Sequence, residues 1–324
     1  MSRARLVLLA AAVLLSLVIG VAAGPTHLAP ADVWRALMHG DAPAAIVVRG
    51  IRLPRVLLAF LVGGSLAVTG ASLQALVRNP LAEPFLLGLS GGAGLGAVLA
   101  IASGTTSPLA VPLAAFAGAL LAVGTVYRVA AVSGRRLDPN VLLLGGVVVG
   151  AFATALMSAV IAVAEAAELK SAFGWLLGGF GAASWRALVA FASWAVLPLA
   201  VLLWHARALD LLSLGDDAAQ YLGADAPRVR RTVFVVGSLL TAASVAVCGV
   251  IGFVGLVVPH AIRRLGAPLH RSLLPLAFLG GGAFLVLCDA VARTVVAPLE
   301  LPVGVMTALV GVPLFAVLLR RTAT

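Results

Sequence analysis

Residues Val56 to Val77 read VLLAFLVGGSLAVTGASLQALV, an uninterrupted apolar stretch without a charged side chain. A helix needs about 20 such residues to cross roughly 30 Å of hydrocarbon. The stretch also lacks the alternation of apolar and polar residues that marks the strands of a membrane barrel. It therefore predicts a transmembrane helix and indicates an all-α membrane protein.

Further apolar runs of the same kind occur along the chain. Together they predict about ten transmembrane helices, at 6–23, 56–77, 86–102, 111–131, 141–163, 187–204, 232–250, 253–262, 273–295 and 303–319. The 324 residues are 62% hydrophobic and only 10% charged, with a mean hydropathy of +1.14. This composition excludes an ordinary soluble domain. We expect residues 1–324 to form a single transmembrane domain.

The basic residues between these runs predict the orientation of the chain. With both termini in the cytoplasm, fifteen arginines face the cytoplasm and seven basic residues lie outside, as the positive-inside rule requires. The cytoplasmic set is Arg3, Arg5, Arg78, Arg128, Arg135, Arg136, Arg207, Arg228, Arg230, Arg231, Arg263, Arg264, Arg271, Arg320 and Arg321. The net charge of +10 is thus explained by the topology of the chain in the membrane. Nucleic acid is not an expected partner, because the arginines have no interleaved aromatic residues.

The first apolar run has an alternative interpretation. Arg3 and Arg5 precede it and small residues end it at Val21 to Ala23, a pattern that also fits a cleaved signal sequence. Cleavage would leave the orientation of every later span unchanged.

A polar island, Leu209 to Val229, interrupts the apolar runs and reads LDLLSLGDDAAQYLGADAPRV. Asp216 and Asp217 suit the first turn of a helix, and Gly223 suits a left-handed helix end. The island therefore predicts two short amphipathic helices on the cytoplasmic face, placed to contact another protein. Lys170 is the only lysine, so the chain has no GxxxxGK[ST] phosphate loop. If nucleotide powers this protein, the motor is a separate subunit.

A basic cluster lies on the predicted external side, where the positive-inside rule disfavours it. Arg49, Arg52 and Arg55 form the core of this cluster, and Arg186 and Arg293 lie on the same side. Guanidinium groups bind carboxylates through two hydrogen bonds, so the cluster could receive an acidic partner protein. Anchoring to lipid headgroups explains the cluster equally well.

The segment after the second predicted span is irregular. Pro80 and Pro84 prevent a continuous helix, so residues 79–84 should form a cytoplasmic turn. Irregular backbone at a pore mouth can act as a gate. An ordinary tight turn followed by glycine-rich packing is the alternative.

Asp289 is the clearest acidic residue inside a predicted span. Acidic residues within membranes usually mark ion pathways or ion pairs. One interpretation is therefore an ion-coupled secondary transporter. The other is a pair with Arg293, one helical turn further along.

Two further patterns are weaker. Gly88 to Gly91 reads GLSG, the GxSG pattern of rhomboid-like intramembrane serine proteases, with His260 as the one histidine within an apolar run. Cys248 and Cys288 lie inside apolar runs, and the remaining histidines have no helical partner, so no metal site is expected. No catalytic residue and no cofactor is predicted.

Four blocks of the chain, in order, resemble the permease subunits of type II ABC importers for iron-siderophores, haem and cobalamin. They are RLPRVLLAFLVGGSLAVTGASLQALVRNPLAEPFLLGLSGGAGLG from Arg52, LLSLGDDAAQYLG from Leu211, GFVGLVVPHAIRRL from Gly252 and ELPVGVMTALVGVPL from Glu300. The resemblance covers nearly the whole chain.

The resemblance implies a ten-helix permease that pairs with a second permease copy, identical or paralogous. It also implies two copies of an ABC ATPase subunit and an extracytoplasmic binding protein as partners. The residues it implies are Leu214, Gly215, Asp216, Asp217, Tyr221, Leu222 and Gly223 for ATPase coupling, Arg52, Arg55 and Arg293 for binding-protein docking, and Asn79 and Leu81 for a cytoplasmic gate. We expect an importer in the inner membrane that moves an iron-siderophore, with haem or cobalamin as the alternative cargo.

Overall fold

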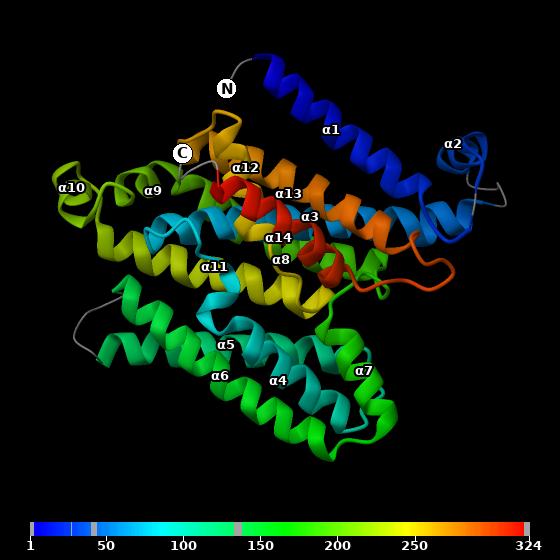
Figure 1. The fold of residues 1–324 in the computed structure, drawn as a ribbon, viewed down its shortest axis with the longest axis horizontal. Helices are drawn as coiled ribbons and strands as arrows, with labels where there is room; N and C mark the ends of the chain where they lie inside the picture. The colour runs from blue at the N-terminus through cyan, green and yellow to red at the C-terminus, as the bar shows by residue number, and fades with distance from the viewer. Residues whose placement is uncertain (1–2, 27, 40–43, 133–137, 321–324) are drawn as a thin grey trace.

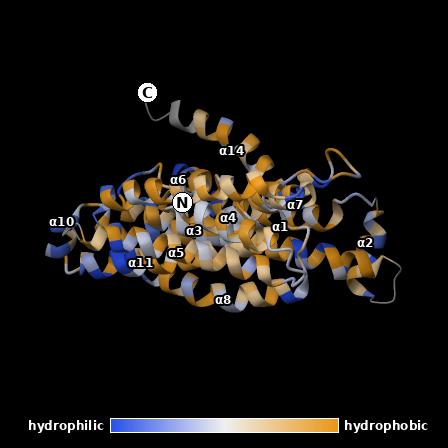
Figure 2. Cartoon of the chain, turned by 90° about the horizontal axis from the view of Figure 1, so that it is seen from below, coloured by the Kyte–Doolittle hydropathy of each residue, from blue (hydrophilic) through white to orange (hydrophobic). Residues whose placement is uncertain are grey.

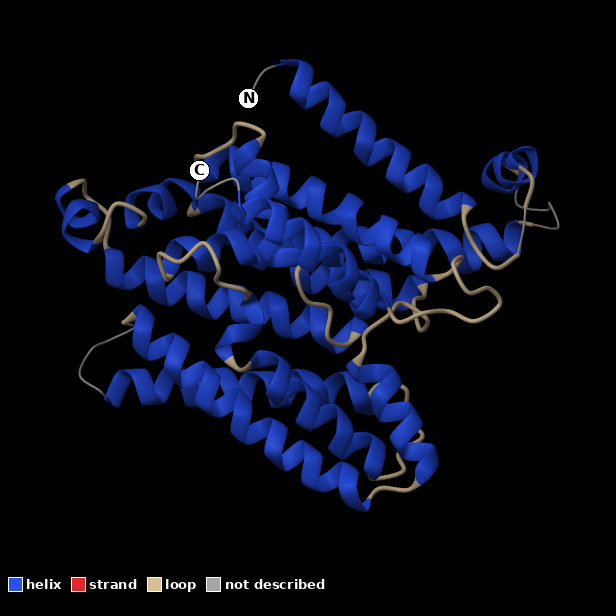
Figure 3. Ribbon diagram, viewed as in Figure 1, coloured by secondary structure: helices blue, strands red, loops and turns tan. Residues whose placement is uncertain are grey.

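The computed structural model describes residues 3–26, 28–39, 44–132 and 138–320, and every regular element among them is a helix (Figure 3). The helices of the first half are α1 (Arg3–Ala22), α2 (Pro30–Met38), η1 (Ile46–Arg52), α3 (Leu53–Leu76), η2 (Pro84–Leu87), α4 (Leu89–Ala102), α5 (Ala110–Val132) and α6 (Pro139–Val163). Those of the second half are α7 (Ala166–Leu176), α8 (Trp185–Trp204), α9 (Ala206–Leu212), α10 (Asp216–Tyr221), α11 (Ala226–Cys248), α12 (Val254–Arg264), α13 (His270–Ala292) and α14 (Val303–Arg320).

The prediction of an all-α polytopic membrane protein is confirmed. Seven helices within the described residues are long and apolar enough to cross a membrane, and α4 and α14 are shorter apolar helices. The run predicted at 253–262 is the eleven-residue α12, which is only about 16 Å long. The run predicted from residue 86 begins with a 3-10 turn, so α4 starts at Leu89. The sequence did not predict α2, η1 or α7.

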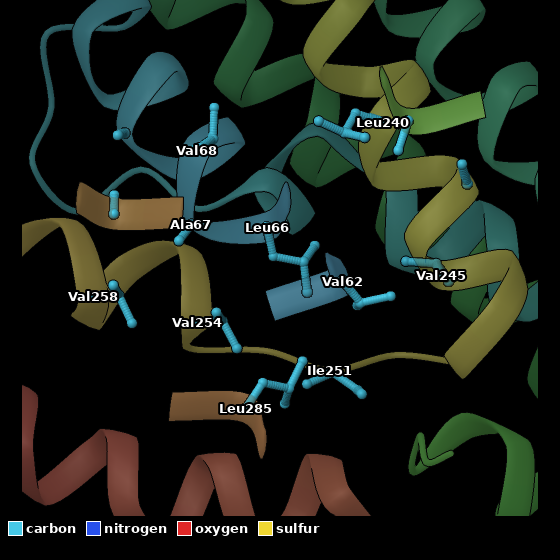
Figure 4. Close-up of a cluster of buried hydrophobic side chains, with 14 of the residues drawn as sticks. Val62, Leu66, Ala67, Val68, Leu240, Val245, Ile251, Val254, Val258 and Leu285 are labelled. Carbon is cyan, nitrogen blue, oxygen red and sulfur yellow. The ribbon is translucent and has the colours of Figure 1, made fainter. Parts of the chain in front are cut away.

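Helix α3 lies at the centre of the packing. Most of its residues are buried, and it packs most extensively against α13. A Cβ atom added to Gly63 would lie 2.3 Å from the carbonyl oxygen of Gly281 on α13, so the two backbones meet without side chains between them. Val62 and Leu66 of α3 join residues of α11, α12 and α13 in one apolar cluster (Figure 4).

The outer helices consist mostly of hydrophobic residues (Figure 2), and many of their large apolar side chains are exposed. Helices α1, α6 and α8 are long and apolar but largely unburied, as lipid-facing spans are. Trp185 and Trp204 lie at the two ends of α8, and both are exposed. Twenty residues of helix span about 30 Å, so these tryptophans match the two aromatic belts of a membrane protein.

The two ends of the helical bundle differ in what they carry (Figure 1). Helix α10 protrudes at the end where α1 begins, and α2 lies at the opposite end. Hydrophilic residues gather near α10 and the start of α11 (Figure 2). His27, Arg135, Arg136 and Arg321 lie outside the described residues, as does the side chain of Arg320.

Candidate functional site

The polar island folds as the sequence predicts, into the two short helices α9 and α10. Gly215 has φ 110° and separates them, and Gly223 has φ 84° just after α10. Both angles favour glycine, because a Cβ atom is strained there. Ala219 is fully buried, and the carboxylate of Asp216 accepts a hydrogen bond from Arg230 on α11. The island is therefore a fixed protrusion on the bundle.

This anchoring leaves four of the predicted coupling side chains facing outward. Tyr221 is 92% exposed, Leu214 66% and Leu222 59%, and Asp217 is also exposed. We call Leu214, Asp217, Tyr221 and Leu222 the tip surface. Large apolar side chains that are exposed together on a protrusion are typical of a protein interaction site.

The turn after α3 is irregular, as the two prolines predict. The Oδ1 atom of Asn79 accepts a hydrogen bond from the N–H of Leu81 at 2.9 Å, and Leu81 is exposed. The carboxylate of Glu83 accepts a hydrogen bond from the N–H of Phe253, just before α12. Burial raises the pKa of Glu83, while that hydrogen bond lowers it. The turn is thus tied to α12, and its role as a gate stays a prediction.

At the opposite end, two arginines of the predicted external cluster form an ionic network with two carboxylates. Arg55 Nη2 lies 2.8 Å from Asp289 Oδ1, and Arg293 Nε lies 3.0 Å from Asp289 Oδ2. Arg55 Nη1 also lies 2.9 Å from Glu300 Oε2. Asp289 is fully buried, whereas the side chain of Glu300 is 37% exposed. Glu300 is therefore the member of the network that faces outward.

The arginines also hold the end of α1. Arg52 Nη1 donates to the carbonyl oxygen of Ala22 at 2.7 Å, and Arg293 donates to those of Gly20 and Ala23 at 3.0 Å each. The last carbonyls of a helix lack partners within the helix and carry partial negative charge, so they attract guanidinium groups.

The three predicted docking arginines are therefore not at an open rim in this structure. Arg52, Arg55 and Arg293 are 3%, 7% and 2% exposed. The sequence missed Glu300 and the α1 carbonyls as their partners, because no local pattern links segments so far apart. Docking of a binding protein to these arginines stays a prediction. Because they are buried and already bind groups within the chain, a partner could reach them only by displacing one of these groups.

The structure also bears on the alternative interpretations. Asp289 pairs with Arg293, as the second of its two interpretations predicted, and Arg55 is an additional positive partner. Ser90 lies in a small pocket against α6, whereas the ring of His260 packs on Phe315 of α14. The GxSG pattern thus has no histidine partner among the described contacts. No group of three metal-binding side chains occurs within the described residues.

A helical bundle whose outer helices are long, apolar and largely unburied, with a short helix protruding at one end, is the architecture of a multi-pass membrane protein. Residues 8–321 match the model of the FecCD transport family, so the chain belongs to that family. It is the permease subunit of an ABC importer, and ATP hydrolysis is carried by a separate subunit. The expectation that this chain is not itself an enzyme is confirmed.

Named relatives make the comparison more specific. The chain is 45% identical to the cobalamin import system permease BtuC of Halobacterium salinarum, over 86% of this chain and 74% of the relative. It is 40% identical to the vitamin B12 import system permease BtuC of Escherichia coli, over 98% and 94%. A structure described as an inward-facing metal-chelate type ABC transporter aligns with a TM-score of 0.85 at 33% identity, over 97% of both chains.

The buried network gives the first testable prediction. Asp289→Asn removes the carboxylate that Arg55 and Arg293 share and leaves Arg55 only the more exposed Glu300. Breaking a buried ion pair from one side costs about 3–5 kcal/mol. We expect a large loss of stability in denaturant unfolding of the detergent-solubilised protein. Asp32→Asn is the matched control, because its pair with Arg35 is on the surface and is worth about 0–1 kcal/mol. Equal unfolding of the two variants would show that the network contributes little.

Proposed function

We propose that this importer carries cobalamin. The supporting observation is that two relatives, 45% and 40% identical and aligned over most of this chain, are named as cobalamin or vitamin B12 import permeases. An iron-siderophore, the cargo favoured in the sequence analysis, has weaker support. The name of the structural relative, a metal-chelate type transporter, is general enough to include either cargo.

The cargo is tested in proteoliposomes that contain the permease, its ATPase and its binding protein. We expect radiolabelled cyanocobalamin to accumulate only when ATP and the binding protein are both present. A ferric siderophore supplied in the same way should not accumulate. Uptake of the siderophore without cobalamin would overturn the assignment, and uptake of either without ATP would indicate a secondary transporter.

We further propose that the chain works as one permease domain over residues 1–324, beside a second permease copy. Two ATPase subunits would bind in the cytoplasm, and a binding protein would dock outside. The excess of fifteen arginines over seven supports cytoplasmic termini, and α10 protrudes at the end where α1 begins. In this orientation the seven residues from Leu214 to Gly223 predicted for ATPase coupling lie in the cytoplasm.

The tip surface gives a prediction about ATPase binding. Asp217→Arg reverses a charge on an exposed side chain, so we expect weaker association with the ATPase and an intact fold. Co-purification of the two subunits measures the association. Asp32→Arg makes the same charge change on α2, at the other end of the bundle, and should leave association unchanged. If the Asp217→Arg variant and a separate Tyr221→Ala variant both bind the ATPase as strongly as the wild type does, the coupling role is contradicted.

Docking by the buried arginines would require a route to them. Glu300 occupies one side of Arg55 and is the most exposed member of the network. We propose that an acidic residue of the binding protein pairs with Arg55 by taking the place of Glu300. Arg52 and Arg293 would add positive potential behind this position.

This proposal makes a prediction of unusual sign. Glu300→Gln removes the competing carboxylate, so affinity for the binding protein should rise, most clearly at low salt. Surface binding assays on the purified permease measure that affinity. Glu165→Gln, with the same charge change at the exposed start of α7, should have little effect. A lower or unchanged affinity for the Glu300 variant would count against docking through this network.

A further inference from the structure

Helix α13 begins without a cap of its own. Its N-cap residue, Leu269, has no side-chain acceptor for the first N–H groups. The carboxylate of Asp210, on α9, supplies one from 60 residues earlier in the chain. Its Oδ1 atom accepts a hydrogen bond from the N–H of His270 at 2.8 Å and lies 2.7 Å from His270 Nδ1. A carboxylate at a helix start is also favoured by the helix dipole.

This contact lies in a packed junction of three helices. His270 is only 4% exposed, and its ring also approaches the backbone of Ala71 on α3. Leu209 and Leu212, on either side of Asp210, are 0% and 1% exposed, and α9 packs against both α3 and α13. Helix α9 is therefore seated on the two central helices of the bundle.

The junction lies between two distant parts of the molecule. Leu214, the first residue of the tip surface, follows Asp210 by one helical turn. In the other direction, Asp289 lies about 28 Å along α13 from His270, and Asp289 holds the buried ionic network. The start of α13 is thus the place where the coupling segment meets a helix that reaches the other side of the membrane.

We propose that Asp210 is a positioning residue that transmits movement of the coupling segment to α13. This inference rests on the proposed ATPase coupling. Apolar contacts allow helices to slide, whereas a charged hydrogen bond to a helix start fixes direction and register. When the tip surface moves, the cap obliges the start of α13 to move with it.

The polar island has a second ionic contact with the bundle, but this contact is less suited to transmitting movement. Asp216 pairs with Arg230 near the start of α11, but the Asp216 side chain is 45% exposed. The side chain of Asp210 is 21% exposed, and the partners of both carboxylates, His270 and Arg230, are buried. The two contacts therefore differ in how far water and salt reach the carboxylate, and Asp210 is the better shielded of the two.

The test compares two carboxylates that cap helices. Asp210→Ala removes a cap provided across helices, whereas the matched control Asp225→Ala removes the cap that Asp225 gives its own helix α11. Both variants are assembled with the ATPase and binding protein in proteoliposomes, and substrate transported per ATP hydrolysed is measured. We expect a fall of about fivefold or more for Asp210→Ala, the low end of coupling between two sites. Asp225→Ala should keep the wild-type ratio.

Further variants separate transmission from simple loss of structure. Asp210→Asn keeps an acceptor oxygen and should recover most of the ratio. Thermal unfolding of each assembled complex shows how far stability changes. A wild-type ratio for Asp210→Ala, or an equal fall for Asp225→Ala, would overturn this inference alone. Absence of ATP-driven transport by the wild-type complex would instead overturn the proposed function.

Discussion

The structure depends on the neutralisation of a carboxylate that is fully buried near the C-terminal end of a membrane helix. Asp289 on α13 pairs with Arg55 from α3 and with Arg293, the residue just after α13, and Arg293 also binds the end of α1. A buried charge without partners would be costly in a membrane. The network therefore fixes three helices at one level, and the close approach of Gly63 and Gly281 fixes α3 and α13 further along.

Much of this architecture could be predicted from the sequence, because its causes are local. Apolar runs of sufficient length predicted most of the spans, and the prolines at 80 and 84 predicted the irregular turn. Asp216 and Asp217 marked the start of α10 and Gly223 marked its end, because both signals act on the backbone next to them. The pair of Asp289 with Arg293 followed from its spacing of one helical turn.

The parts that could not be predicted depend on contacts between distant segments. Nothing near Arg55 in the chain indicates Glu300, and nothing near Asp210 indicates that it caps α13. The sequence predicted that Arg52, Arg55 and Arg293 are exposed. Their backbone partners, the carbonyl groups at the end of a helix, occur in every chain and leave no signal in the sequence. Helix α12 was predicted as a short span, but it is a half-length helix packed against α3 and α13.

The pairing of Arg55 with Asp289 has a consequence for biogenesis. The two residues are 234 positions apart, so α3 leaves the ribosome long before its counter-ion is made. Arg55 lies near the start of α3, and at the end of a membrane helix a long side chain can extend to the headgroups and keep its charge hydrated. We expect the Arg55 side chain to stay hydrated at the headgroups until α13 is inserted and supplies Asp289. The position of the arginine along its helix thus suits the order of synthesis as well as the finished fold.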